Sequence, residues 1–344
     1  MCRIGFLTYK KHHTLESLPY FYRLAKVAKA LGMRLYAFSI DDLDVQRKTV
    51  RAVIGKDATA TKASARSAEM IPTTQTIAWP DVFYDFVRYH PTKQFARYLK
   101  LRAQNILPSL YRGGSNKWRQ YEILSQHENL IPHLPKTIRW QHTLDISKIM
   151  TLFSGQPVLI KPIHGTGGKG ILAVEHADGH IFNNLSDVII QEKLDLKFGD
   201  RLYDTRVLVQ KNTWGRWTVT GLGTRSAPNT SLVTNLSHGG TALRTEHFLQ
   251  NIAHLPVTET LQTIERLSLN VAETLEASFG PLVELGLDIA ITRDAHLYLL
   301  EANTKPDRMI LLKTGQKEAF VRAHARPLLY LCEMFTSGNL RAYR

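Results

Sequence analysis

The stretch from residue 158 to 171 narrows the choice of folds more than any other. It reads VLIKPIHGTGGKGI, so an apolar strand ends at Lys161 and four glycines follow within six residues, namely Gly165, Gly167, Gly168 and Gly170. Glycine tolerates the positive φ angles with which successive backbone N–H groups turn toward one anion. The pattern indicates a phosphate-binding loop. The same sequence pattern would also fit a flexible turn that follows a solvated lysine at the end of a strand.

A second stretch, residues 284–303, reads ELGLDIAITRDAHLYLLEAN and predicts a β-hairpin. A two-residue turn at 294–295 would place Asp288 directly across from Glu301, and period two would put Asn303 and Leu299 on the face of Glu301. Paired carboxylates with an amide oxygen are typical ligands of magnesium or manganese. The alternative is a pair of surface acids on a half-exposed hairpin.

Charge and composition limit the class of protein. The 344 residues include 44 Lys and Arg against 30 Asp and Glu, a net charge of +14, which favours polyanionic partners. A basic surface that only keeps the protein soluble explains this equally well, and no nucleic-acid-binding motif is present. The apolar runs are too short to span a membrane. Basic residues follow the first apolar run, the reverse of a secretory signal, so we expect a cytoplasmic protein.

The two cysteines, Cys2 and Cys332, are far apart and lack metal-ligand spacing. They predict neither a disulfide framework nor a zinc site, and Cys332 is expected to be a small core residue.

Strand and helix patterns divide the chain into two domains. Residues 1–108 alternate strands (CRIGFLTY, MRLYAFSI, TVRAVIG) with a helix at Tyr20–Leu31, which predicts a parallel sheet. The first strand is not followed by GxGxxG, so a dinucleotide site is disfavoured. Residues 109–335 form the second domain, and 336–344 form a tail.

The second domain is expected to begin with a helix near Asn116. A small lid at about 134–187 contains a helix over Asp145–Phe153 and a hairpin turned at Ala177–Gly179. A carboxylate-bearing part at about 188–335 contains a long helix, Thr258–Phe279, and a final helix kinked or split at Pro327.

These residues, in this order, resemble the ATP-grasp fold, through KPIHGTGGKG, the QE hinge of IIQEKLDL, the arginine of DTRVLV and LLEAN. More narrowly, the chain is similar to the YheC/YheD-like ATP-grasp proteins associated with bacterial spore coats. The shared motifs span about Trp79 to Arg308 and are PDVFYDF, NKWRQYEIL, LPKT, DTRVLVQKNTWGRWTVTG, TNLSHGG, ELGLDIAI and EANTKPDR. One departure is TRSAPNTS, which stands where a small glycine turn is expected.

The resemblance implies an α/β and α+β architecture, namely an ATP-grasp fold behind an N-terminal parallel-sheet (pre-ATP-grasp) domain. It also implies an ATP site with magnesium, or manganese in its place. The implied metal ligands are Asp288, Glu301 and Asn303, and the implied catalytic residues are Lys161 and Arg206. The implied nucleotide contacts are Lys117, Lys161, His164, Gly165, Thr166, Gly167, Gly168, Lys169, Gly170, Gln191, Glu192, Lys193, Leu194 and Arg206.

Two functions follow from the resemblance. The first is an ATP- and magnesium-dependent carboxylate–amine ligase that proceeds through an acylphosphate, with an acidic peptide as one candidate substrate for the basic surface. The second is a spore-coat structural or assembly protein that keeps the scaffold and nucleotide binding without turnover. Nucleic-acid binding ranks third, and spore association is the alternative to a purely cytoplasmic location.

Overall fold

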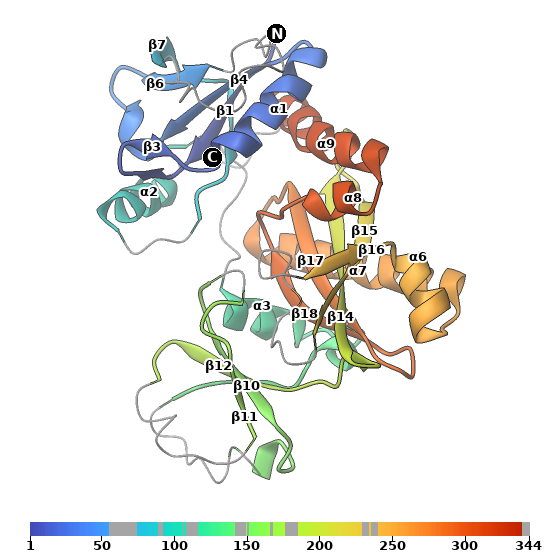
Figure 1. Cartoon of the computed structure of the whole chain (residues 1–344). Helices are drawn as coiled ribbons and strands as arrows, with labels where there is room; N and C mark the ends of the chain where they lie inside the picture. The colour runs from blue at the N-terminus through green and yellow to red at the C-terminus, as the bar shows by residue number, and fades with distance from the viewer. Residues whose placement is uncertain are drawn as a thin grey trace.

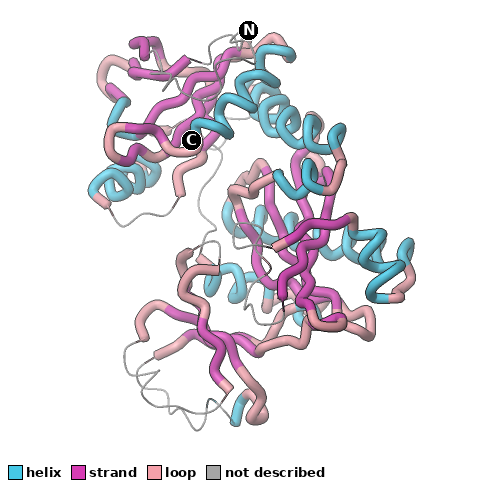
Figure 2. The backbone as a smooth tube through the Cα atoms, viewed as in Figure 1, coloured by secondary structure: helices cyan, strands magenta, loops and turns pink. Residues whose placement is uncertain are grey.

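The computed structural model describes residues 1–54, 74–88, 92–104, 106–107, 116–141, 149, 151–165, 168–175, 185–228, 234 and 240–338. Three sheets of four or six strands organise these residues, together with one two-stranded hairpin. Figure 1 shows the sheets as three successive bodies, and Figure 2 shows each as a separate magenta group. A mixed α and β architecture with parallel strands was predicted, and it is confirmed.

The N-terminal sheet has the order β5-β6-β4-β1-β8, with β7 paired to β6. Its central strands are parallel, and β1 is buried from Ile4 to Thr8, as expected for a strand covered on both faces. Helix α1 (Leu18–Ala30) buries Phe21, Leu24 and Ala28. The strands are β1 (Arg3–Thr8), β4 (Arg34–Ser39), β5 (Leu43–Asp44), β6 (Thr49–Ile54), β7 (Thr74–Ala78) and β8 (Val82–Asp85).

The predicted parallel pairing holds for β4, β1 and β8, but not for the rest of the N-terminal sheet. Strand β6 pairs antiparallel with β4, and β5 and β7 pair antiparallel with β6. The reason is the short connection after β4, which holds only a single 3-10 turn, η1 (Ile40–Asp42), and β5. A parallel pairing needs a longer crossover, usually a helix.

Short elements surround the carboxyl ends of the parallel strands. They are the hairpin of β2 (Lys10–Lys11) and β3 (Thr14–Leu15), and helix α2 (Lys93–Ala103). Thr92 caps α2, because its side chain accepts a hydrogen bond from the backbone N–H of Phe95.

The smallest of the three sheets is antiparallel, in the order β11-β10-β12-β9, and carries Lys161. Its core contains Trp140, Ile149 and Phe153. The strands are β9 (Thr137–Arg139), β10 (Val158–Pro162), β11 (Leu172–Val174) and β12 (Val188–Glu192).

The third sheet, in the order β16-β15-β14-β17-β18 with β13 paired to β14, is antiparallel throughout. Helix α7 (Val257–Phe279) packs in the core of one face. Helix α8 (Met309–Lys313) contacts the other face, on β15. The strands are β13 (Lys197–Phe198), β14 (Arg201–Lys211), β15 (Trp217–Pro228), β16 (Thr241–Leu243), β17 (Glu284–Ile291) and β18 (Leu297–Asn303).

The remaining elements are short. Helix α3 (Lys117–Leu124) begins at the expected N-terminus, where the side chain of Asn116 accepts a hydrogen bond from Arg119 N–H at 2.9 Å. The others are η2 (Ile131–His133), α6 (Thr245–Phe248) and η4 (Leu249–Ala253).

Helix α9 (Lys317–Thr336) joins the two large bodies, as the red helix in Figure 1 shows. Its first half buries Ala319 and Ala323 against the third sheet, and its second half buries Leu328 and Leu331 in the N-terminal core. A kink or a split was expected at Pro327, and the helix is continuous through this residue, so the split does not occur.

The cysteine prediction was wrong. Cys2 and Cys332 form a disulfide across 330 residues of sequence, with their Cα atoms 6.0 Å apart. Sequence spacing could not indicate this pair, because α9 packs beside the start of β1 only in the folded chain. Cys332 is nevertheless a buried member of the N-terminal core, as expected.

Some expected features lie outside the described residues. They are the hairpin turned at Ala177–Gly179, most of the helix over Asp145–Phe153, and the tail from residue 339. Within the ranges given above, no helix has the length and hydropathy to cross a membrane.

Stability should depend on pH through His324 of α9. Burial, together with the nearby Arg308 and Arg23, lowers the pKa of His324 to about 4, although the hydrogen bond to the carbonyl of Phe320 opposes them. A base whose pKa is lower in the folded state than the ordinary 6.5 contributes its full stability above pH 6.5, and this is lost as the pH falls toward 4.

We expect the free energy of unfolding of the wild-type protein to fall by about 3 kcal/mol between pH 6.5 and pH 4, measured by urea unfolding. His324→Phe should remove this loss. Phenylalanine keeps the ring that packs on Phe320 but cannot be protonated. His127→Gln, at an exposed histidine, is the control. An H324F curve parallel to that of the wild type would contradict the assignment.

Candidate functional site

The β17–β18 hairpin carries the predicted carboxylates, and Asp288 pairs with Glu301 as expected. The turn differs from the prediction. Thr292 N–H donates to His296 O at 3.0 Å, so three residues form the loop, with Ala295 at φ 63°. A bulge then shifts the register between Asp288 and Ile289 and restores the predicted pair.

This bulge, at Leu300, also decides which face each residue occupies. Leu299 pairs with Ile289 and lies in the core under α7, so its expected place on the face of Glu301 was wrong. Without an extra residue, period two would carry Glu301 into that core as well. Beyond the bulge Ala302 faces the core, and Glu301 and Asn303 occupy the opposite face.

Asp288 lies between two arginines. Arg206 on β14, its neighbour in register, donates to both carboxylate oxygens, through Nε and, at 3.1 Å, through Nη2. Arg225 on β15 approaches from the other side, with Nη2 3.1 Å from Asp288 Oδ1. Burial alone would raise the pKa of Asp288, but the two guanidinium groups outweigh it and hold that pKa below its ordinary value.

Arg225 is shared with a second acid. Its Nε donates to Asp204 Oδ1 at 2.8 Å, and its Nη2 pairs with the other oxygen of Asp204. Burial lowers the pKa of Arg225, but Asp204 and Asp288 more than compensate and raise it above its ordinary value. Arg225 therefore remains charged although it is buried.

Lys117 connects the glycine loop to the carboxylates. Its Nζ donates to Gly165 O at 2.8 Å and lies 3.3 Å from Glu301 Oε1. Gln120, one turn later on α3, donates to Ala302 O at 2.7 Å and so fixes the helix to β18. Lys117 N–H also donates to Ile163 O at 3.1 Å, just before the loop.

Lys161 is buried at the end of β10, with 8% of its surface exposed, and is not a solvated strand-end lysine. Its Nζ donates to Gln191 Oε1, and Gln191 Nε2 in turn donates to Thr137 Oγ1 at 2.8 Å. Burial, together with Lys117, lowers the pKa of Lys161 to about 8, although Glu301 and Asp288 oppose this shift. These groups therefore lie within one electrostatic environment.

Residues 191–194, which the family resemblance implies to bind the adenine edge of ATP, make their contacts within the small sheet. Glu192 N–H donates to Lys136 O at 2.9 Å, and Glu192 Oε1 accepts from Lys136 N–H at 2.7 Å. Lys193 N–H donates to Pro157 O at 3.0 Å, and Leu194 follows half-buried. Adenine recognition by this segment stays a prediction.

The glycine loop is described in part. Gly165, Gly168 and Gly170 have positive φ angles, and Lys169 is exposed. Thr166 and Gly167 lie outside the described residues. Burial, together with Lys117, lowers the pKa of His164, and Asp187 opposes them. Their contacts with a nucleotide stay a prediction.

The oxygen donors suit magnesium. Among the described residues no cluster of three His, Cys, Asp or Glu side chains could hold a metal ion, so the carboxylates of Asp288 and Glu301 would need the amide of Asn303. Magnesium usually takes one or two carboxylates together with phosphate oxygens and water. The donor types of this set fit this requirement, and in the structure the two carboxylates are paired with Arg206, Arg225 and Lys117.

Sequence reasoning missed three residues of this site. Arg225 and Asp204 were missed because they join the site only through cross-strand pairing, in which Arg225 contacts both Asp204 and Asp288. Gly286 was missed because only the fold shows its neighbours. A Cβ there would lie 2.6 Å from Pro306 Cβ and 3.5 Å from Arg206 Cδ.

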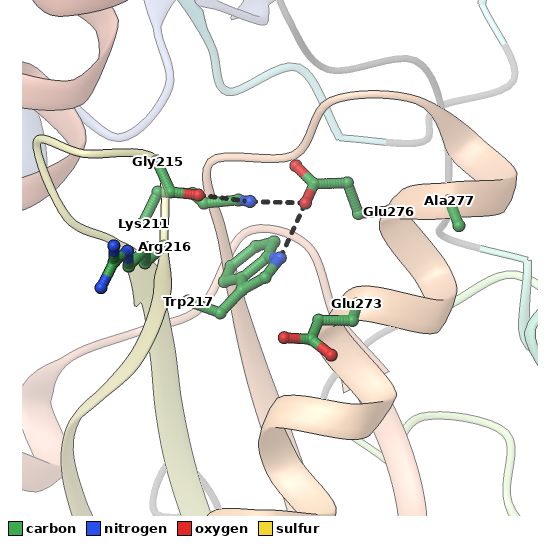
Figure 3. A pocket seen from close by; sticks show the side chains of 7 residues that line it. All are labelled: Lys211, Gly215, Arg216, Trp217, Glu273, Glu276 and Ala277. Carbon is green, nitrogen blue, oxygen red and sulfur yellow. Dashed lines mark hydrogen bonds and ion pairs between the residues drawn. The ribbon is translucent and has the colours of Figure 1, made fainter.

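A cavity of about 540 Å³ lies away from these residues, beside α7 and the tip of the β14–β15 hairpin (Figure 3). Glu276 is one of the residues that line it; this side chain pairs with Lys211 at 2.5 Å and accepts from Trp217 Nε1 at 2.8 Å. None of the predicted nucleotide or metal residues lines it, so it is not the predicted site.

Comparison with known proteins gives one family. The family described as YheC/D like ATP-grasp matches residues 108–187 and 180–334, more than half of the chain. Endospore coat-associated protein YheC of Bacillus subtilis (strain 168) is 25% identical over 366 residues and is covered to 96%, as is this chain. YheD of the same organism is 28% identical over 232 residues, which cover 57% of this chain and 49% of YheD.

Solved structures show the fold. N5-carboxyaminoimidazole ribonucleotide synthetase from Thermotoga maritima superposes with a TM-score of 0.56 at 13% identity, over 95% of this chain and 76% of that one. D-alanine–D-alanine ligase from Bacillus anthracis, complexed with ATP, superposes with a TM-score of 0.55 at 14% identity, over 100% and 99%. At these identities the likeness supports the predicted fold alone.

The pairing of Arg225 can be tested by stability. Arg225→Met leaves Asp204 buried without its guanidinium, and removing one partner of a buried ion pair typically costs about 3–5 kcal/mol. We expect that loss in urea unfolding, and we expect Asp204→Leu in the same protein to recover most of it. An R225M protein as stable as the wild type would contradict the pairing.

Proposed function

The chain belongs to the YheC/D-like ATP-grasp family, and we propose that it is a ligase that uses ATP to join a carboxylate to an amine. The observation that carries this proposal is the position of Lys117, between the carbonyl of Gly165 and the carboxylate of Glu301. A phosphate-binding loop and a metal-binding acid that share one lysine are close enough to serve one triphosphate.

The proposed reaction has two steps. A carboxylate oxygen of the first substrate attacks the γ-phosphorus, the bond to the β,γ-bridging oxygen breaks, and ADP leaves. The amine nitrogen then attacks the acylphosphate carbon, phosphate leaves, and the amine releases a proton to water. Magnesium, when bound, would neutralise charge on the β- and γ-phosphates.

The chain's own groups would act by position and charge. Lys161 and Lys117 would hold phosphate oxygens, and Arg206 would steady the transferred phosphoryl group with its planar fork. Asp288 is ionised before substrate arrives, because Arg206 and Arg225 depress its pKa. Since phosphoryl transfer depends on placement and charge neutralisation, no catalytic histidine is required.

The substrates follow only as classes. The net charge of +14 suits an acidic acceptor such as an acidic peptide. Loops that differ between relatives usually build such acceptor sites. The substrates are therefore named only by class, as a carboxylate and an amine.

A second function is favoured by the names of the relatives. YheC and YheD are both described as endospore coat-associated proteins. A coat-assembly protein could keep nucleotide binding without turnover. The retained Lys161, Asp288, Glu301 and Asn303 favour the ligase, because assembly alone does not need two acids and an amide in register.

Turnover separates these two functions. We expect ADP release that requires both a carboxylate and an amine from a substrate panel, and that chelation of divalent cations abolishes. Glu301→Gln and Lys161→Met should each lower the rate by at least about a hundredfold, because each removes a charge that faces the phosphates.

Glu265→Gln, on the exposed face of α7, is the control and should leave the rate unchanged. Nucleotide binding without ADP release across the whole panel would favour the coat-assembly function. In that case a spore phenotype unaffected by E301Q would exclude the ligase.

A further inference from the structure

The segment that follows the metal-binding strand, residues 304–308, lies between the two large bodies and is fixed at several points. Lys305 Nζ donates to Val87 O in the N-terminal domain and lies 3.8 Å from Asp85 Oδ1. Pro306 packs against Gly286, the residue that pairs with Asn303. The segment is therefore anchored within three residues of a predicted metal ligand.

Arg308 provides the last anchor. Only 1% of its surface is exposed, and its guanidinium donates to groups from four elements. Nε donates to Ala323 O of α9 at 2.9 Å, and Nη1 donates to Tyr20 of α1. Nη2 pairs with Glu284 of β17 and donates to Tyr84 of β8 at 3.2 Å.

The partners of this segment follow one face of β17. Glu284, Gly286 and Asp288 alternate along the strand, so all three point to the same side. Arg308 pairs with the first, Pro306 covers the second and Arg206 pairs with the third. After Asn303, therefore, the chain lies beside β17, the strand that contains Asp288, as far as Glu284.

The N-terminal domain contributes directly to this arrangement. Tyr84 donates to Glu284 and accepts from Arg308, and its hydroxyl lies 3.3 Å from that of Tyr20. Gln210 of β14 completes the group by donating to Glu284 at 2.7 Å. Since Tyr84, Gln210, Glu284 and Arg308 are buried, a hydrogen bond lost between them would not be replaced by water.

We propose that Arg308 is a positioning residue for the metal-binding strand. By fixing residues 304–308 against Tyr84 and Glu284, it holds Glu301 and Asn303 in register with Asp288. The N-terminal domain thus sets the geometry of the phosphate and metal site, which it does not itself enter. This inference rests on the proposed function for its metal, and on the described contacts for its geometry.

Two mild substitutions test this role. Tyr84→Phe removes one hydroxyl and keeps the ring that packs on Phe6 and Phe86. Arg308→Lys keeps the charge beside Glu284 but cannot reach all of the other partners at once. Ser39→Ala is the control, because it removes a buried hydroxyl bonded to Asp42 at 2.7 Å in the same domain, without touching the segment.

Two measurements decide the outcome. The first is amide hydrogen exchange of residues 297–308 in the nucleotide-free protein. The second is the magnesium concentration at which binding of a non-hydrolysable ATP analogue is half-saturated. We expect the exchange rates and the half-saturating magnesium concentration each to rise roughly tenfold in Y84F and R308K. The reason is that loss of a group that orients metal ligands typically costs 10–100-fold in metal affinity. Analogue affinity without magnesium should stay within about twofold of the wild type.

The control separates positioning from simple stability. S39A and Y84F are compared under conditions in which their thermal stabilities are equal. If S39A then raises the amide exchange rates and the half-saturating magnesium concentration as much as Y84F does, the proposal is wrong. Faster exchange with an unchanged magnesium requirement also overturns it. If the wild-type protein binds no nucleotide, the proposed function fails, and hydrogen exchange alone decides whether Arg308 positions β18.

Discussion

Asp288 keeps its charge inside the protein because guanidinium groups from two strands, Arg206 on β14 and Arg225 on β15, lie against it. A buried carboxylate without partners would take up a proton and lose its value as a ligand. The antiparallel order β15-β14-β17 brings both arginines to one acid. Asp204 balances the second arginine, so the group carries two negative and two positive charges before any phosphate arrives.

Around this group, the small sheet and the third sheet are connected through charged side chains. Lys117 contacts the glycine loop and Glu301, and Lys161 lies close enough to Glu301 and Asp288 for both to influence its pKa. The triphosphate of the proposed reaction would replace these contacts between protein charges with contacts to phosphate. The lysines and arginines are thus already concentrated where negative charge is expected, which limits the reorganisation required during the reaction.

Some of the site could be predicted from the sequence because its signals are local. The glycine loop is contiguous, Lys161 ends its strand, and the opposition of Asp288 and Glu301 follows from hairpin pairing. The pairing was right although the turn was wrong, because the third loop residue and the bulge at Leu300 compensate for each other in register. Arg225, Gly286 and Arg308 gave no such signal, since the side chains that they contact lie from 20 to 288 residues away in the sequence.

The sequence by itself determined the family and fold, because glycines, alternation and capping residues act over a few neighbouring positions. It also determined which charged residue types reach the site. Only the tertiary structure decided how those charges are paired, that Cys2 meets Cys332, and that residues 304–308 contact both Val87, just after strand β8, and Glu284 of strand β17. The physical reason is that burial and ion pairing depend on distances in space, which are fixed only when α9 and the three sheets pack together.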